Sequence, residues 1–136
     1  MTATEILKET KEFYEADPNG RRALNGGACM YKSAETGSMC AVGRKLLDIP
    51  TFIAEIQLVT GNPSCATFSL AEIADNNWEK IGGLDQFLEE ECRGLPFGFW
   101  VDLQEFHDNY DYWGSNGLTL TGQAEYNRLA RVWGDR

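Results

Sequence analysis

The sequence predicts a mainly helical, compact single globular domain over residues 1–136, with about five to six helices in a bundle. Hydrophobic residues make up 43% of the chain, which is enough to form a core and too many for a disordered acidic segment. Apolar side chains recur three and four residues apart in several segments, as they do on one face of a helix. One short β-hairpin near residues 28–42 is expected in addition, and an α+β fold is the alternative.

The first helix is expected over residues 3–16. Thr2 and Glu5 have the spacing of a capping box, and the apolar residues that follow fall on one helix face. Asp17-Pro18-Asn19-Gly20 should end this helix, because proline and glycine interrupt the hydrogen-bond ladder. A strand or hairpin that turns at Glu35-Thr36-Gly37 is then expected.

Helical segments are also expected in the middle of the chain. Ser38 can cap a short helix that runs through Leu47 and stops before Pro50. Residues 51–59 are ambiguous, because their apolar spacing fits a helix but the stretch is short. Ser69-Leu70-Ala71-Glu72 is a second capping box, and the helix that it opens should close at Gly82-Gly83.

The strongest periodicity lies in the last third of the sequence. After a short helix around residues 84–88, a central helix is expected because five apolar side chains form one stripe. Thr121 can cap a last helix, with Gly134 just past its end. The residues of the stripe are Phe99, Leu103, Phe106, Tyr110 and Trp113.

The formal charge of −9 is concentrated in one block of the sequence. The chain has 21 acidic and 12 basic residues, and residues 72–111 contain eleven of the acids but only two bases, Lys80 and Arg93. This charge excludes a protein that binds nucleic acid through a basic surface. The block could be a solvated helical face that keeps the protein soluble. It could instead be an acidic surface that competes for a groove lined by lysine and arginine.

The second explanation is favoured, because solubility alone does not require the acids to be segregated. We therefore expect a protein that binds stoichiometrically to a basic surface of another protein, and an inhibitor rather than a catalyst. The partner surface could be that of a nucleic-acid-binding effector. The candidate partner-binding residues are Asp85, Glu89, Glu90, Asp102, Glu105 and Asp108.

An alternative hypothesis is a small hydrolase or nucleotide-modifying enzyme. His107 is the only histidine, and Asp111 lies one helical turn further on, with Asp108 on the same flank. Cys40 would lie in the first turn of a helix capped by Ser38, where the helix dipole lowers a thiol pKa. Cys40 could equally be a small buried residue, and a lone histidine beside an apolar face is usually structural.

A third hypothesis is a sponge for a small signalling ligand. The ligand would occupy a pocket lined by the aromatic residues of segment 97–113. A phosphorylated ligand would need Arg21, Arg22, Arg44 or Lys45 beside that pocket. We expect no metal centre and no cofactor, because the four cysteines contain no Cys-x-x-Cys pair and residues 37–45 lack the spacing of a phosphate loop.

Several short motifs resemble a group of small uncharacterised proteins encoded by phages and prophages. The motifs are Cys29-Met30-Tyr31, the segment 37–43 with Cys-Ala-Val-Gly, and Leu103-Gln104-Glu105-Phe106-His107-Asp108 followed by Trp113. None of them is specific for a chemistry, and the group supplies no catalytic role for Cys40 or His107. The resemblance implies an accessory protein that blocks a bacterial host or antiviral-defence protein, such as a CRISPR effector.

The compartment expected from the sequence is a bacterial cytoplasm. The first residues have neither the basic nor the apolar part of a secretory signal. No apolar run approaches the roughly 20 residues that cross a bilayer. We therefore expect the four cysteines to be reduced.

Overall fold

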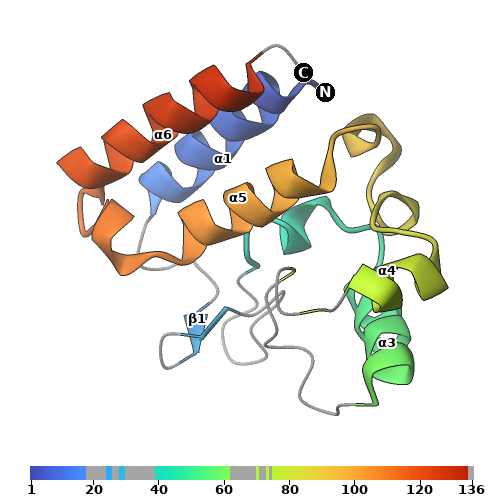
Figure 1. Ribbon diagram of the computed structural model, residues 1–136. Coiled ribbons are helices and arrows are strands. Elements are labelled where there is room, and N and C mark those ends of the chain that lie inside the picture. Colours follow the sequence, from blue (N-terminus) through green and yellow to red (C-terminus); the bar gives the residue numbers. More distant parts are fainter. Residues whose placement is uncertain are drawn as a thin grey trace.

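Helices form most of the computed structural model, which describes residues 1–17, 24–25, 28–29, 39–61, 70, 73 and 75–134. Helices α1 (Ala3–Ala16) and α6 (Leu120–Trp133) pack side by side, with the start of α1 and the end of α6 at the same end (Figure 1). Helix α5 (Phe97–Asp108) packs against α6, and α3 (Ile49–Thr60) packs against α4 (Asp75–Ile81). The predicted fold class, mainly α with a short hairpin, is confirmed.

The N-terminal helix forms as its local sequence predicts. The Glu5 amide donates to Thr2 Oγ1 over 3.1 Å, and the Thr2 amide donates to Glu5 Oε1 over 3.2 Å, which completes the capping box. Both bonds satisfy amides that would otherwise lack a helical acceptor. The ambiguous segment 51–59 is also helical, as part of α3, and Asp48 caps this helix by accepting from the Thr51 amide over 3.3 Å.

The helix predicted from Ser38 to Leu47 is wrong over the part that the structure describes. Only the 3₁₀ turn η1 (Gly43–Lys45) forms among residues 39–47. The reason is a tertiary contact, because the Leu47 amide donates to the Phe87 carbonyl over 2.8 Å and the Glu89 amide donates to the Lys45 carbonyl over 2.9 Å. These bonds hold the chain in extended pairing with residues 87–89 and prevent a continuous helix.

The short helix predicted near residues 84–88 is replaced by two 3₁₀ turns, η4 (Asp85–Phe87) and η5 (Glu90–Cys92). They follow α4, which ends as predicted at Gly82-Gly83, where both glycines have positive φ. Helix α4 begins at Asp75, later than the predicted capping box, of which residues 69, 71 and 72 lie outside the described residues.

Helix α5 is shorter than the stripe of five apolar residues predicted. It ends at Asp108, so Tyr110 lies in the 3₁₀ turn η6 (Tyr110–Tyr112) and Trp113 begins strand β3 (Trp113–Gly114). Trp113 nevertheless packs on Phe106, with ring centroids 5.4 Å apart, and its indole nitrogen donates to the Phe106 carbonyl over 2.8 Å. Phe99, Leu103, Phe106 and Trp113 of the stripe are core residues as predicted, but the stripe overstates the length of the helix.

Two antiparallel ribbons complete the described structure. In the first, β1 (Leu24–Asn25) pairs with β2 (Ala28–Cys29), so the hairpin begins earlier than predicted, and the predicted turn at residues 35–37 lies outside the described residues. In the second, β3 pairs with β4 (Gly117–Leu118). This second ribbon brings Thr119, not the predicted Thr121, to the cap of α6, where it accepts from the Gly122 amide over 3.0 Å.

The core lies between α1, α5 and α6 and continues beneath α3 and α4. Within the described residues, no helix combines the length and the apolar character that a membrane span requires. The largest side chains that are fully buried include Trp100, Tyr14, Phe52, Phe99 and Phe106.

Candidate functional site

The predicted acidic residues on α5 are mostly committed to contacts within the fold. Asp102 Oδ2 accepts a hydrogen bond from the indole nitrogen of Trp133 over 3.0 Å. Asp108 Oδ1 lies 2.7 Å from Nδ1 of the buried His107. Glu105 is exposed. Of the three acids predicted on this helix, Glu105 is thus the one whose carboxylate is most available to a partner.

Of the other predicted acids, Asp85 lies on η4, Glu89 just before η5 and Glu90 on η5, at the opposite end of α5 from Glu105. Leu88 and Cys92 are fully buried and anchor this segment, so that the glutamates between them lie toward the surface. Glu90 and Glu91 are exposed and Glu89 is half-buried. We call Glu89, Glu90 and Glu91 the acidic turn.

The acidic turn has no ion pair with a lysine or arginine among the described residues. The nearest cation bonded to it is the N-terminal amine, which donates to the main-chain carbonyl of Glu91. Asp85 is exposed just before the turn, and one of its oxygens accepts from the Gly94 amide over 3.0 Å. No lysine or arginine side chain among the described residues therefore offsets the charge of the acidic turn.

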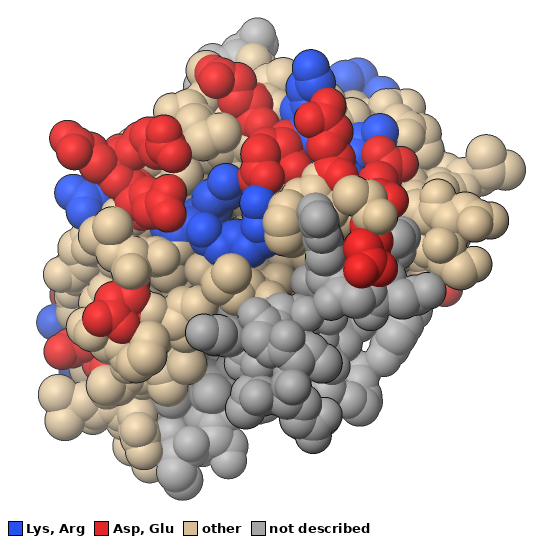
Figure 2. Space-filling model, turned by 180° about the vertical axis from the view of Figure 1, so that it is seen from behind, with Lys and Arg blue, Asp and Glu red and all other residues tan. Residues whose placement is uncertain are grey.

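The acidic residues do not form one uninterrupted surface. Figure 2 shows that, on the face seen from behind, acidic side chains surround a group of lysine and arginine side chains. Glu9 on α1 takes part in such a group, since its carboxylate accepts from Arg44 over 2.6 and 3.0 Å and from Lys45 over 2.7 Å. The six acids predicted to bind a partner therefore lie in two separate places. One set lies on or between η4 and η5, and the other lies on α5.

The contacts of Glu9 also change how it titrates. Burial of its carboxyl raises the pKa, but hydrogen bonds and charge attraction from Arg44 and Lys45 outweigh burial, so the pKa is lowered. Lys45 is only 7% exposed, so its ammonium depends on this carboxylate.

We expect Glu9→Gln to reduce stability at neutral pH, and the deficit to shrink in acid. A lowered folded-state pKa means that the carboxylate stabilises the fold above its ordinary pKa of about 4.3 and that this contribution is lost as the pH falls through the folded-state value. Urea unfolding of both proteins at neutral pH and near pH 3 measures this. Glu12→Gln, on the exposed side of the same helix, is the control and should change little.

His107 is buried and does not pair with Asp111 as the helical spacing predicted. Because α5 ends at Asp108, Asp111 lies in η6 with an exposed side chain, and Asp108 is the neighbour of His107 Nδ1. The ring of Tyr14 packs edge-on against His107, with centroids 4.8 Å apart. His107 is 0% exposed, so a substrate cannot reach it without an opening of the core.

Cys40 is likewise buried, at 0% exposure, and its Sγ accepts from the Gly43 amide over 3.3 Å. It lies before η1 and not in the first turn of an α-helix, so the predicted position of its thiol at a helix N-terminus is wrong. Its position fits the alternative of a small core residue. Neither Cys40 nor His107 therefore offers an accessible nucleophile or base.

A set of possible metal ligands lies within the acidic segment. Side-chain ligand atoms of Glu89, Glu91 and Cys92 all lie within 4.8 Å of one another. Burial raises the pKa of the Cys92 thiol, and the two glutamates raise it further against the opposing effect of Lys45. The thiolate that binds a metal is therefore disfavoured, and we do not assign a metal centre here.

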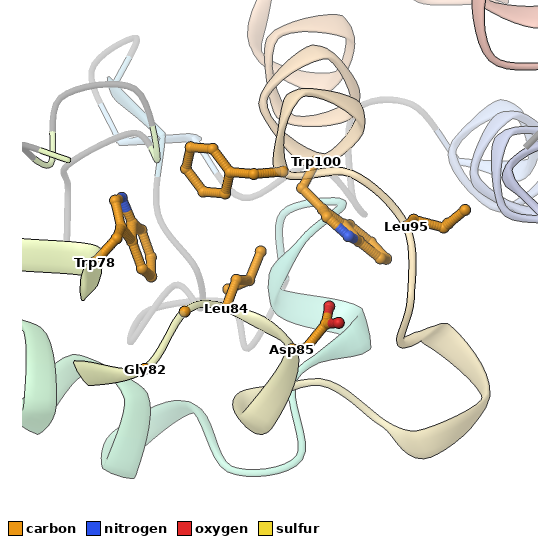
Figure 3. A pocket seen from close by; sticks show the side chains of 8 residues that line it. Trp78, Gly82, Leu84, Asp85, Leu95 and Trp100 are labelled. Carbon is orange, nitrogen blue, oxygen red and sulfur yellow. The ribbon is translucent and has the colours of Figure 1, made fainter. Parts of the chain in front are cut away.

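A pocket of about 380 Å³ opens between the end of α4, η4 and the start of α5 (Figure 3). Phe97 and Trp100, from the aromatic segment 97–113, line it together with Trp78. Arg44 and Lys45 pair with Glu9 and do not line it, while Arg21 and Arg22 lie outside the described residues. The described pocket thus lacks the basic residues that the sponge hypothesis needed for a phosphorylated ligand.

Comparison of the chain with protein-family models, with curated proteins and with solved structures gave no match. The class that the fold and site define is a small, mainly helical acidic domain with an exposed acidic turn and an aromatic pocket. The sequence predicted the acidic segment and, through the aromatic residues of segment 97–113, part of the lining of the pocket, namely Phe97 and Trp100. The contribution of Trp78 to this lining was not predicted, since Trp78 lies outside that segment and reaches the pocket from α4.

Proposed function

We propose that this protein is a binding protein that attaches stoichiometrically to a basic surface of another protein and inhibits it. One observation carries the proposal: the three consecutive glutamates of the acidic turn lie between the buried Leu88 and Cys92, with Glu90 and Glu91 exposed and Glu89 half-buried, and no lysine or arginine among the described residues pairs with them. Dense carboxylates gain Coulomb attraction to a cleft lined by lysine and arginine, and they speed the encounter with it.

The partner chemistry follows from this charge. A surface that binds nucleic acid has the required density of cations, because it must neutralise phosphates. Taken with the resemblance to phage and prophage proteins, this leads us to propose a bacterial host or antiviral-defence protein as the target. The acidic turn and Asp85 are the proposed contacts, with Glu105 as a separate exposed acid.

Charge reversal at the acidic turn tests the proposal. Glu90→Lys/Glu91→Lys raises the net charge by four at exposed positions of η5, and Glu12→Lys/Asp111→Lys raises it by the same four at exposed positions of α1 and η6. A tagged wild-type chain should copurify a partner from a bacterial lysate at low salt and lose it at high salt. The first double variant should then bind the purified partner about tenfold more weakly, and the second about as tightly as wild type.

Two results would contradict this function. Equal weakening by both double variants would mean that net charge alone, and not the acidic turn, drives binding. Binding that persists unchanged in the Glu90→Lys/Glu91→Lys variant would remove the turn from the interface. Circular dichroism of each variant confirms that the helices are retained.

A further inference from the structure

The aromatic pocket between α4, η4 and the start of α5 has a mainly apolar lining. Phe97 is 37% exposed and so lies at its rim, whereas Trp100 is 0% exposed and lies at its floor. The rings of Trp78 and Phe97 are in contact, with centroids 5.2 Å apart, and together form one wall. Figure 3 shows Trp78 and Leu95 on opposite sides of the pocket, with Leu84 between them. A side chain that enters from solvent would therefore meet mostly apolar groups.

The size of the pocket suits a side chain better than a larger ligand. Its volume of about 380 Å³ lies near the lower end of the range of roughly 300–1,000 Å³ for small-molecule sites. It thus has room for at least one large apolar side chain. In protein interfaces, side chains that fill such pockets supply most of the binding energy.

Negative charge lies beside the pocket. Asp85 is the one charged residue among the described residues that line it. One Asp85 oxygen accepts from the Gly94 amide over 3.0 Å, which leaves the other oxygen to accept from a cation. Segment 85–95 contains four acids, namely Asp85 and the three glutamates of the acidic turn, and one base, Arg93. Arg93 donates through Nε to the Leu88 carbonyl over 3.1 Å and does not line the pocket.

The acidic turn belongs to the same loop as the pocket. The hydrogen bond between Asp85 and the Gly94 amide closes this loop, and Leu95, which lines the pocket, follows directly. Glu91 is three residues before Gly94, so their Cα atoms are at most about 11 Å apart. Three or four residues of extended chain span that distance. One short segment of a partner can therefore contact both the pocket and the acidic turn.

We infer that the pocket and these acids receive one segment of the partner protein. A large apolar side chain of that segment enters the pocket, and lysine or arginine side chains within a few residues of it contact Asp85 and the acidic turn. This inference rests on the proposed function and specifies which part of a basic partner surface is recognised. Charge attraction speeds the encounter and is screened by salt, whereas burial of the apolar side chain adds affinity that salt does not screen.

Defined peptides test the inference directly. The first probe is a capped heptapeptide with a central leucine between lysines, the second has alanine in place of the leucine, and the third keeps the leucine between serines. Binding is measured by NMR titration, followed at the amides of Gly82 and Gly83, which line the pocket.

The first peptide should bind most tightly at low salt. We expect it to bind about tenfold more tightly than the alanine peptide, because leucine buries more apolar surface. We expect a similar advantage over the serine peptide, because the lysines meet the carboxylates. At about 0.5 M salt the advantage over the serine peptide should largely disappear, while the advantage over the alanine peptide should remain.

Matched variants locate the contacts of the peptide. Phe97→Ala removes part of the wall and should weaken the first peptide about tenfold at both salt concentrations. Leu120→Ala is its control and should change nothing, because Leu120 is also the first residue of a helix, is 93% exposed and does not line the pocket. Asp85→Asn keeps an oxygen for the Gly94 amide and should weaken the lysine peptides but not the serine peptide. Asp111→Asn, at an exposed acid of η6, should affect none of them.

Four outcomes would overturn the inference. If the leucine and alanine peptides bound equally, or neither bound at millimolar concentration, no apolar side chain would enter the pocket. If the serine peptide bound as tightly as the first peptide at low salt, the pocket would be merely apolar. If Leu120→Ala weakened binding and Phe97→Ala did not, the peptide would bind elsewhere. If the free protein self-associated and Phe97→Ala abolished this, a second copy of the chain would be the occupant.

Failure of this inference can be distinguished from failure of the proposed function. Binding of a purified partner that is weakened by Glu90→Lys/Glu91→Lys but not by Phe97→Ala would support the proposed function and overturn the inference. Peptide binding that depends on Phe97 and Asp85, together with partner binding that is unchanged by Glu90→Lys/Glu91→Lys, would support the pocket as a peptide site and remove the acidic turn from the interface.

Discussion

Gly122→Ala is expected to destabilise the protein by about 3 kcal/mol, because there is no room for a methyl group at this position. A Cβ on Gly122 would lie 2.0 Å from the carbonyl oxygen of Tyr112 and 2.9 Å from a methyl carbon of Leu118. The Tyr112 carbonyl cannot easily move, since it accepts from the Thr119 amide over 3.0 Å where the β3–β4 ribbon leads into α6. Urea unfolding followed by circular dichroism measures the loss.

Gly98→Ala is the matched control, because Gly98 is also a helical glycine. Its added Cβ would meet only the Trp133 ring, at 3.4 Å, and the position is exposed. Alanine is preferred over glycine in a helix by about 1 kcal/mol, so this variant should be as stable as wild type or slightly more so. If Gly122→Ala unfolded at the same urea concentration as wild type, the close packing of α6 on Tyr112 would be refuted.

Tyr14→Ala is expected to cost about 4 kcal/mol, a large part of the 5–15 kcal/mol that stabilises a typical domain. Tyr14 is 0% exposed and joins three parts of the fold. Its ring packs edge-on against His107 of α5 at 4.8 Å and against Trp113 of β3 at 6.0 Å, and its hydroxyl donates to the Met39 carbonyl over 2.5 Å. Truncation would open a cavity between α1 and α5.

Tyr14→Phe distinguishes the contribution of the hydroxyl to stability from that of the ring. It keeps the packing and removes one hydrogen bond, so the expected loss is about 1 kcal/mol. Thermal and urea unfolding of both Tyr14 variants measure the two contributions. A Tyr14→Phe variant as unstable as Tyr14→Ala would show that the hydrogen bond to Met39, and not the packing of the ring on α5, supplies the stability.

The candidate site could be predicted in part. The excess of acids in residues 72–111 is a property of composition, so the sequence alone located the acidic segment that includes Glu89 and Glu90. It could not show that Asp102 accepts from Trp133 or that Asp108 turns to His107. Each of those contacts depends on the direction in which a side chain leaves its helix, and, for Asp102, on a residue 31 positions away in the chain.

The positions of several helix ends and helix faces follow from residues that are close together in the sequence. The capping box of Thr2 and Glu5, the amphipathic face of α1 and the stop at Gly82-Gly83 each depend on residues only a few positions apart, and all of them are found in the structure. The rules that govern caps and helix faces act over one or two turns, which a sequence displays directly.

Only the tertiary structure decided where the chain departs from those local preferences. Pairing of residues 45–47 with residues 87–89 replaced a predicted helix by the turn η1, and the β3–β4 ribbon moved the cap of α6 from Thr121 to Thr119. The pocket that joins Trp78 to Trp100 exists only because α4 and α5 come together. Hydrogen bonds and packing between distant segments outweigh local propensities of a few tenths of a kcal/mol per residue, and a single sequence does not reveal which segments will meet.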